Sequence, residues 1–280
     1  MNAQIQTSLE LEKLSPTIGA IVHGVDMGKP VGEVVRAELY QALLDHKVIF
    51  FRDQDISTEQ HIAFSRLFGD LEVHPFTSNK SASPEVICIT HDKNSRGKEN
   101  AWHSDVTWRE EPSLGSLLRA IEVPDVGGDT LFADMEAAYE HLSQTLKDSL
   151  EGKTALHDFT HFRRRFQKEG KQEELAALER RYPNPEHPVI RTHPDTGRKS
   201  IYVNIGFTRH IVGMQRDESD KLLKYLYSRA AIPEYQCRFR WQKNSVAFWD
   251  NRSCQHYATS DYWPEVRQME RVTVVGGKPV

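Results

Sequence analysis

The feature that most restricts the fold of this chain is a long succession of short, strand-like segments that begins near residue 85. Most of them are rich in β-branched or aromatic residues, and glycine, proline or asparagine separates one from the next. This pattern favours a β-sandwich or jelly roll over a parallel α/β sheet. The segments expected to form strands are 85–90, 114–121, 130–133, 189–193, 201–204, 237–241, 246–249 and 269–275. We therefore expect a mainly β fold with flanking helices.

The helices are predicted from apolar residues at helical spacing. Residues 32–46 carry such a stripe and precede the apolar run 47–51, which predicts a helix followed by a buried strand. Ser57 and the residues after it offer acceptor side chains for the start of a second helix, whose apolar positions continue to Gly69. Further helices are expected at 135–150, 162–181 and 217–231. Because no linker, repeat or low-complexity stretch interrupts the chain, we expect residues 1–280 to form a single domain.

The composition is that of an ordinary globular protein, with 38% hydrophobic and 27% charged residues. A formal net charge of -4 gives no reason to expect nucleic acid or an anionic membrane as a partner. Cys88, Cys237 and Cys254 lack metal-binding spacing, so we expect no disulfide framework and a reducing compartment. The polar N-terminus has no apolar signal core, and no apolar run reaches the length of a membrane span. These observations predict a cytoplasmic protein.

The stretch Trp102-His103-Ser104-Asp105 places an imidazole and a carboxylate two positions apart. On an extended segment, alternation would point His103 and Asp105 to one face and Ser104 to the other. His256 is the candidate for a third ligand, which would complete a 2-His-1-carboxylate triad of the kind that binds non-haem Fe(II). Two plainer interpretations stay open: a histidine bonded to a carboxylate without metal, and a tetrahedral zinc site.

Two arginines follow His256 on a segment that alternates like a strand. Arg267 and Arg271 would share one face of this segment. A guanidinium is suited to bidentate capture of a carboxylate or another oxyanion, so two of them beside a metal indicate two anionic groups to be held. The alternative is a solvated strand face that is ion-paired to Glu265 or Glu270.

Taken together, these motifs resemble the taurine dioxygenase-type Fe(II)/2-oxoglutarate-dependent dioxygenases, a group that also holds alkylsulfatases and aryloxyalkanoate dioxygenases. The similarity runs from about Leu14 to the C-terminus, and it implies a double-stranded β-helix, a jelly roll whose mouth holds the metal. The motifs that carry it are Trp102-His103-Ser104-Asp105, Gly127-Gly128-Asp129-Thr130, His187-Pro188-Val189-Ile190-Arg191-Thr192-His193-Pro194, Trp249-Asp250-Asn251-Arg252, His256, and Arg267 with Arg271.

The resemblance also implies roles for individual residues. His103, Asp105 and His256 would bind Fe(II), while Thr130 and Arg267 would hold the far carboxylate of 2-oxoglutarate. With O2 as the oxidant, such an enzyme converts 2-oxoglutarate to succinate and CO2 and hydroxylates its substrate.

The implied substrate is a small anionic organic molecule, above all an organosulfonate such as taurine, with alkyl sulfates and aryloxyalkanoates as alternatives. Arg271 and His74 would hold its anionic group, and Phe159 and Phe207 would wall the pocket. Thr77 stands where such taurine enzymes tend to carry tyrosine, and Glu99 and Asn100 stand where an asparagine is expected. These departures argue against taurine itself.

Two further expectations concern architecture and class. The segment 161–181 is dense in charged residues, which predicts a solvated helix, but the matching insert in the family often covers the active-site mouth, so a lid around 160–185 is the alternative. The resemblance also implies a homo-oligomer, either a dimer or a tetramer. From a different class, a zinc hydrolase or a metal-binding jelly-roll sensor would use the same three ligands.

Overall fold

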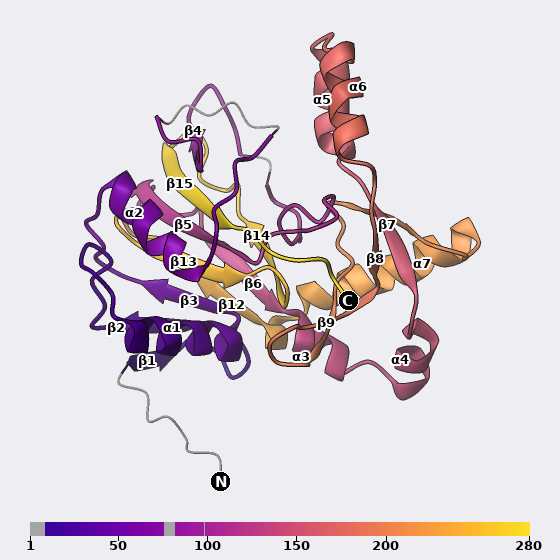
Figure 1. Ribbon diagram of the computed structural model, residues 1–280, viewed down its shortest axis with the longest axis horizontal. Helices are drawn as coiled ribbons and strands as arrows, with labels where there is room; N and C mark the ends of the chain where they lie inside the picture. The colour runs from indigo at the N-terminus through magenta and orange to yellow at the C-terminus, as the bar shows by residue number, and fades with distance from the viewer. Residues whose placement is uncertain (1–8, 76–81, 98) are drawn as a thin grey trace.

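A seven-stranded sheet is the main scaffold of the computed structural model, which describes residues 9–75, 82–97 and 99–280 (Figure 1). Its strand order is β1-β2-β3-β13-β5-β15-β4, and neighbours are antiparallel except for the parallel pair β2 and β3. The strands are β1 Glu10–Lys13, β2 Ala20–His23, β3 Val48–Phe51, β4 Val86–His91, β5 Gly115–Glu122, β13 Val246–Asp250 and β15 Arg267–Val274. Most of these strands match the predicted segments.

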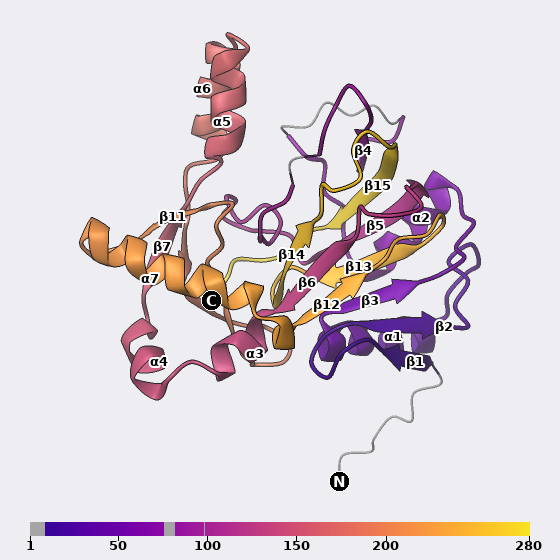
Figure 2. The same cartoon turned by 180° about the vertical axis from the view of Figure 1, so that it is seen from behind.

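A second sheet of three strands packs against the inner face of the first (Figure 2). It consists of β12 Gln236–Phe239, β6 Thr130–Asp134 and β14 Cys254–Ala258, in that order. The two sheets share one core, in which the Phe50 ring of β3 stacks on the Phe239 ring of β12 with centroids 4.0 Å apart. Phe132 of β6 and Trp249 of β13 belong to the same cluster. The predicted jelly roll, mainly β with flanking helices, is thus confirmed as two facing sheets.

Two helices cover the outer face of the large sheet. They are α1 Glu33–His46 and α2 Thr58–Ser65, and the latter continues as the short 3-10 helix η1 Arg66–Phe68. Leu39, Leu43 and Phe64 pack there against Phe51 and Phe248 of the sheet. As predicted, α2 begins after Ser57, whose hydroxyl oxygen accepts from the backbone N–H of residue 60 at 3.2 Å.

The remaining elements form a second hydrophobic cluster beside the small sheet. They are α3 Met135–Glu140, α4 Gln144–Leu150, α7 Arg216–Ser228, the strands β7 Thr154–His157, β8 Glu186–Pro188, β9 Ile190–Thr192, β10 Lys199–Ile201 and β11 Thr208–Ile211, and the 3-10 helices η2 Arg229–Ala231 and η3 Pro233–Tyr235. The predicted helix 135–150 is two helices, because Ser143 caps the start of α4. The predicted strand 189–193 corresponds to β9, and the short strand β8 just before it was not predicted.

Helices α5 Thr160–Lys168 and α6 Gln172–Arg181 form a hairpin that projects from the body (Figures 1 and 2). The sequence predicted one helix over 162–181, but Gly170, with φ of +72°, lies in the turn between two. Phe166 and Leu175 are buried at the hairpin together with Phe159 and Trp108 of the body. The predicted lid segment is therefore an antiparallel pair of helices joined to the body through aromatic contacts.

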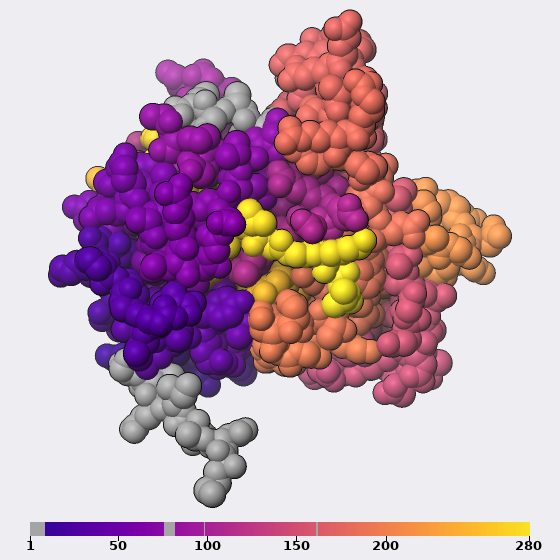
Figure 3. Space-filling model, in the orientation of Figure 1, coloured from indigo at the N-terminus to yellow at the C-terminus, as the bar shows by residue number. Residues whose placement is uncertain are grey.

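The C-terminal segment after β15 crosses the surface of the molecule (Figure 3). At its end, the backbone N–H of Thr192 in β9 donates to the carbonyl oxygen of Val280 at 2.6 Å. No helix within the described ranges is long and apolar enough to cross a membrane.

The stacked pair between the sheets is expected to contribute strongly to stability. Because the Phe50 side chain is fully buried, Phe50→Ala should leave a cavity and lower the free energy of unfolding by about 3–5 kcal/mol. Urea denaturation measures this change. Val34→Ala, at a side chain that is 70% exposed on α1, should change it by less than about 0.5 kcal/mol. Equal effects of the two substitutions would contradict this account of the core.

Candidate active site

His103 and His256 are joined through their backbones. The N–H of His103 donates to the carbonyl of His256 at 3.1 Å, and the N–H of His256 donates back at 2.8 Å. This isolated bridge attaches the segment around His103 to β14, so the two imidazole centroids lie 4.2 Å apart. The sequence did not predict β14, whose residues Cys-Gln-His-Tyr-Ala include no β-branched side chain.

Asp105 completes a cluster of three potential metal ligands. Its Oδ1 lies 3.9 Å from Nε2 of His103 and 3.9 Å from Nε2 of His256, and one ligand atom from each residue lies within 4.8 Å of the others. Ser104 points away and donates to the carbonyl of Cys254 at 2.9 Å, as the alternation predicted. The structure therefore brings together the three residues that the sequence singled out.

Both imidazoles are set up to offer a lone pair toward the centre of this cluster. His103 Nδ1 donates to the carbonyl of Ala101 at 2.8 Å, which leaves its Nε2 as an acceptor. Burial, and then the neighbouring His103, lower the pKa of His256 to about 3, so this ring is neutral at physiological pH. A neutral imidazole is the form that binds a metal ion.

The Asp105 carboxylate is held from both of its oxygens. The Ser116 hydroxyl of β5 donates to Oδ2 at 2.8 Å, and Nη1 of Arg271 on β15 donates to Oδ1 at 2.9 Å. Burial would raise the pKa of Asp105, but the charge of Arg271 and the neighbouring groups outweigh burial and keep this pKa well below its usual range. Asp105 is therefore an anion. Its side chain contacts β5 and β15 of the large sheet, while its own segment is attached to β14 of the small sheet through the His103–His256 bridge.

Asn251 positions this segment from the turn after β13. Its Oδ1 accepts from the Asp105 backbone N–H at 3.1 Å and from Trp249 Nε1 at 2.9 Å, and its Nδ2 donates to Ser113 Oγ at 3.0 Å. The residue is 1% exposed. Asn251 belongs to the sequence motif Trp249-Asp250-Asn251-Arg252, but its positioning role was not predicted, and its place in that motif was the only signal for it.

The rest of that motif forms a buried ion network. Both Asp250 oxygens accept from the Arg252 guanidinium, at 2.8 and 2.7 Å, and Oδ2 also lies 3.0 Å from His193 Nε2. Arg252 reaches Asp195 at 2.7 Å as well. Two motifs that are far apart in the sequence thus fix each other, which gives them a structural role beside the ligand cluster.

A cavity of about 60 Å³ adjoins the cluster and contains both predicted 2-oxoglutarate residues, Thr130 and Arg267. Thr130 Oγ1 accepts from Trp241 Nε1 at 2.9 Å, which leaves its O–H available as a donor. Gly128 has φ of +71°, and a Cβ there would lie 3.2 Å from Cδ of Arg267. The lining residues are Ile89, Glu99, His103, Leu118, Thr130, Trp249, His256, Ala258, Arg267 and Arg271.

Arg267 is a buried cation, 5% exposed. Its Nε donates to the carbonyl of Gly128 at 3.2 Å, while Nη2 has no hydrogen-bond partner among the described residues. No ion pair to a carboxylate is found for it within the described ranges. Burial lowers the pKa of Arg267, but a guanidinium remains charged at physiological pH. A buried charge of this kind favours an anionic ligand in the cavity.

Of the predicted substrate residues, Arg271 and His74 influence each other through charge. Arg271 lines the cavity, and its contact with Asp105 was not predicted. Burial, and then the charges of Arg271 and Arg109, lower the pKa of His74 to about 3. The His74 ring lies 5.7 Å from the Phe162 ring of α5. His74 is thus electrostatically coupled to Arg271 and in contact with the hairpin.

The two predicted pocket aromatics do not line the cavity. The Phe207 ring meets the His103 ring edge-on at 6.3 Å, so it lies beside the ligand cluster. Phe159 is 1% exposed and packs edge-on against Trp108 at 5.6 Å. Glu99 does line the cavity, with Oε2 at 3.3 Å from Nε2 of His91. The departure noted at Thr77 lies outside the described residues.

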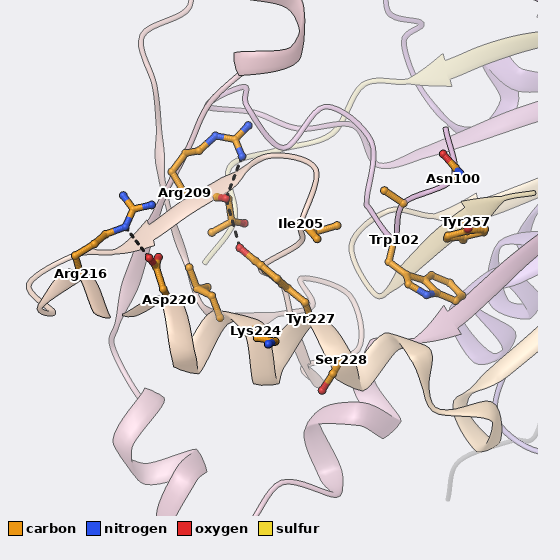
Figure 4. Close-up of a pocket in the computed structure, with 13 residues that line it drawn as sticks. Asn100, Trp102, Ile205, Arg209, Arg216, Asp220, Lys224, Tyr227, Ser228 and Tyr257 are labelled. Atoms are coloured by element: carbon orange, nitrogen blue, oxygen red, sulfur yellow. Dashed lines mark hydrogen bonds and ion pairs between the residues drawn. The ribbon is translucent and has the colours of Figure 1, made fainter. Parts of the chain in front are cut away.

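A second cavity is larger, with a volume of about 780 Å³ (Figure 4). Trp102 and Tyr257 line it, and these are the sequence neighbours of His103 and His256. Alternation points the neighbours to the opposite face of the bridge. None of the three potential metal ligands borders this space, so its size does not mark the candidate active site.

Comparison with known proteins agrees with this geometry. The family described as "Taurine catabolism dioxygenase TauD, TfdA family" matches residues 10–273. An alkylsulfatase of Acinetobacter baylyi is 35% identical over 96% of this chain and 85% of its own length. An alpha-ketoglutarate-dependent sulfonate dioxygenase of Saccharomyces cerevisiae is 30% identical over 97% of this chain and 68% of its own length. The crystal structure of a taurine dioxygenase from Burkholderia xenovorans is 36% identical, with a TM-score of 0.84 over 98% of this chain and 93% of that one.

The chain belongs to the TauD, TfdA family of dioxygenases. It is therefore an alpha-ketoglutarate-dependent dioxygenase, and the family implies Fe(II) as the metal, 2-oxoglutarate as cosubstrate and O2 as oxidant. This confirms the predicted reaction class and replaces the zinc hydrolase and the sensor as interpretations of the three ligands.

Asn251→Ala is expected to loosen the segment that carries Asp105. The substitution leaves the Asp105 N–H and the Trp249 Nε1–H without an acceptor in a buried place, which should lower the free energy of unfolding by about 2–5 kcal/mol. Urea denaturation measures the loss. Gln41→Ala, which removes an exposed hydrogen bond on α1, serves as the control and should cost less than about 0.5 kcal/mol. A loss as small as that of the control would show that Asn251 does not hold this segment.

Proposed function

We propose that His103, Asp105 and His256 are the iron ligands. The observation that carries this assignment is the convergence of two imidazole nitrogens and one carboxylate oxygen within 4.8 Å. This donor set, with a neutral imidazole at His256, suits Fe(II) and leaves coordination positions open. When bound, the iron together with 2-oxoglutarate and O2 supplies the oxidant that hydroxylates a C–H bond of the substrate, with release of succinate and CO2.

We propose that Arg267 and Thr130 hold the far carboxylate of 2-oxoglutarate. The buried guanidinium has a nitrogen without a partner among the described residues, and the Thr130 hydroxyl is oriented by Trp241 to donate. Both residues share one cavity with His103 and His256. A carboxylate placed there would receive charge-assisted hydrogen bonds and would neutralise the buried cation.

The proposed substrate is a small organosulfonate, with its anionic group held by Arg271 and His74. Support comes from the guanidinium of Arg271 at the cavity and from the relatives named for sulfonates and taurine. The Glu99 carboxylate in the same cavity favours a substrate that also carries an ammonium group. An alkyl sulfate ester is the second candidate, because it presents the same three oxygens and the alkylsulfatase relative is 35% identical.

We also propose four properties of the whole protein: its domain organisation, a lid, its oligomeric state and its location. The family match over 10–273 supports a single domain over 1–280. The contact of Phe162 with His74 supports a lid at the α5–α6 hairpin, within the predicted segment 160–185. A dimer or tetramer and a cytoplasmic location rest on the family resemblance and on the composition alone.

Succinate formation tests the proposed function. With Fe(II), ascorbate, O2 and 2-oxoglutarate, a panel of taurine, hexanesulfonate, hexyl sulfate and phenoxyacetate should give the strongest stimulation with a sulfonate. Asp105→Ala removes one ligand and should abolish turnover, whereas Asp55→Ala at an exposed carboxylate should not. Stimulation by phenoxyacetate alone would refute the substrate, and full activity of Asp105→Ala would refute the triad.

Arg267→Ala should act on the cosubstrate. Loss of the charge-assisted contacts is expected to raise the KM for 2-oxoglutarate by roughly 100-fold, and to leave the KM of the prime substrate within a few-fold. Steady-state succinate assays give both constants. Arg240→Ala, at an exposed arginine, is the control. An increase confined to the prime substrate would reverse the assigned roles of Arg267 and Arg271.

A further inference from the structure

We infer that Arg271 couples the metal centre to the substrate anion, so that each of the two strengthens the binding of the other. Arg271 is then a positioning residue for Asp105 as well as an anion-binding residue. The inference rests on the proposed function, because it needs a metal at the three ligands and an anion at Arg271.

The first observation is that one oxygen serves two purposes. Oδ1 of Asp105 accepts from Nη1 of Arg271 at 2.9 Å and also faces the Nε2 atoms of His103 and His256, each at 3.9 Å. The other oxygen, Oδ2, accepts from Ser116 at 2.8 Å. A metal ion bound by the three ligands would therefore share Oδ1 of Asp105 with the guanidinium of Arg271.

The second observation is that Arg271 makes no other ion pair within the described ranges; the nearby carboxylate of Glu72 is paired with Arg109 instead. Its only ion pair there is with Asp105, while the adjacent Glu270 lies 3.6 Å from Arg119 instead. The Nε of Arg271 is buried and makes no hydrogen bond to any described residue. By contrast, nearby Arg109 is already paired with Glu72 at 2.8 Å. Arg271 thus keeps donor capacity for an incoming anion.

The sign of the coupling follows from these charges. A substrate anion at Arg271 weakens the hold of the guanidinium on Oδ1 and offsets its repulsion of a divalent cation. Both effects make the carboxylate a better metal ligand. By thermodynamic reciprocity, a bound metal ion raises the affinity for the anion by the same factor. Couplings between sites in proteins are typically of order tenfold, and we expect about that value here.

The coupling can be measured without turnover by titrating Co(II) into the protein, with hexanesulfonate as the probe. In the wild type, saturating hexanesulfonate should lower the Kd of Co(II) by about tenfold, followed by calorimetry or by the visible absorption of bound Co(II). Arg271→Gln should bind Co(II) by itself, more tightly than the wild type does, but hexanesulfonate should no longer change that Kd. Unchanged Co(II) affinity in the wild type, or coupling that persists in Arg271→Gln, overturns the inference.

Two further variants separate this outcome from instability and from failure of the proposed function. Arg271→Lys keeps the charge without the planar fork, and should retain a smaller coupling of the same sign even if Arg271→Gln folds poorly. Arg66→Gln, which removes an exposed ion pair with Glu85, should show the wild-type coupling. Co(II) binding that survives Asp105→Ala would refute the triad itself. Absence of the hexanesulfonate effect in the wild type, with Co(II) binding intact, would refute only the coupling.

Discussion

The pair of backbone hydrogen bonds between His103 and His256 is the contact on which the candidate active site depends. His103 lies on a segment outside the named strands, and His256 lies on an edge strand of the small sheet. The two residues are far apart in the sequence, so the bridge is what keeps their rings 4.2 Å apart. The bridge also sets the direction of the segment, so that Asp105 turns toward the large sheet.

Asp105 then connects the two sheets through its side chain. Ser116 and Arg271 come from the large sheet, and Asn251 comes from the turn after β13. A buried carboxylate is tolerated only when hydrogen bonds and opposite charge offset its desolvation, and here each carboxylate oxygen of Asp105 accepts a hydrogen bond, one of them from a cation. The contacts that stabilise the buried charge of Asp105 also fix the position of Oδ1, the oxygen that faces the two histidines.

The sequence predicted much of this arrangement because the informative signals were local. Alternation placed His103 and Asp105 together, and it also placed Arg267 and Arg271 on one face of β15. Other features depended on contacts between distant elements, so no local pattern could reveal them. The Arg271–Asp105 ion pair and the orientation of Thr130 by Trp241 are of this kind.

The same distinction holds for the fold. Runs of β-branched and aromatic residues predicted the core strands, including β3 and β13, within a few positions. β14 was missed because its sequence is mixed and its strand character comes from pairing with β6. The single helix predicted over 135–150 is two helices. The apolar spacing continues through the break, so it did not reveal that Ser143 starts a new helix, α4.

The α5–α6 hairpin is structurally separate from the cluster of potential metal ligands. The three potential iron ligands and the cavity lined by Thr130 and Arg267 are built from the two sheets and the segments attached to them, whereas Phe162 approaches His74 from the projecting hairpin. A substitution in the hairpin therefore changes the surroundings of His74 directly, because no described residue of α5 or α6 lines the cavity beside the three ligands. The packing of the hairpin and the geometry of the ligand cluster are thus separate constraints on the sequence.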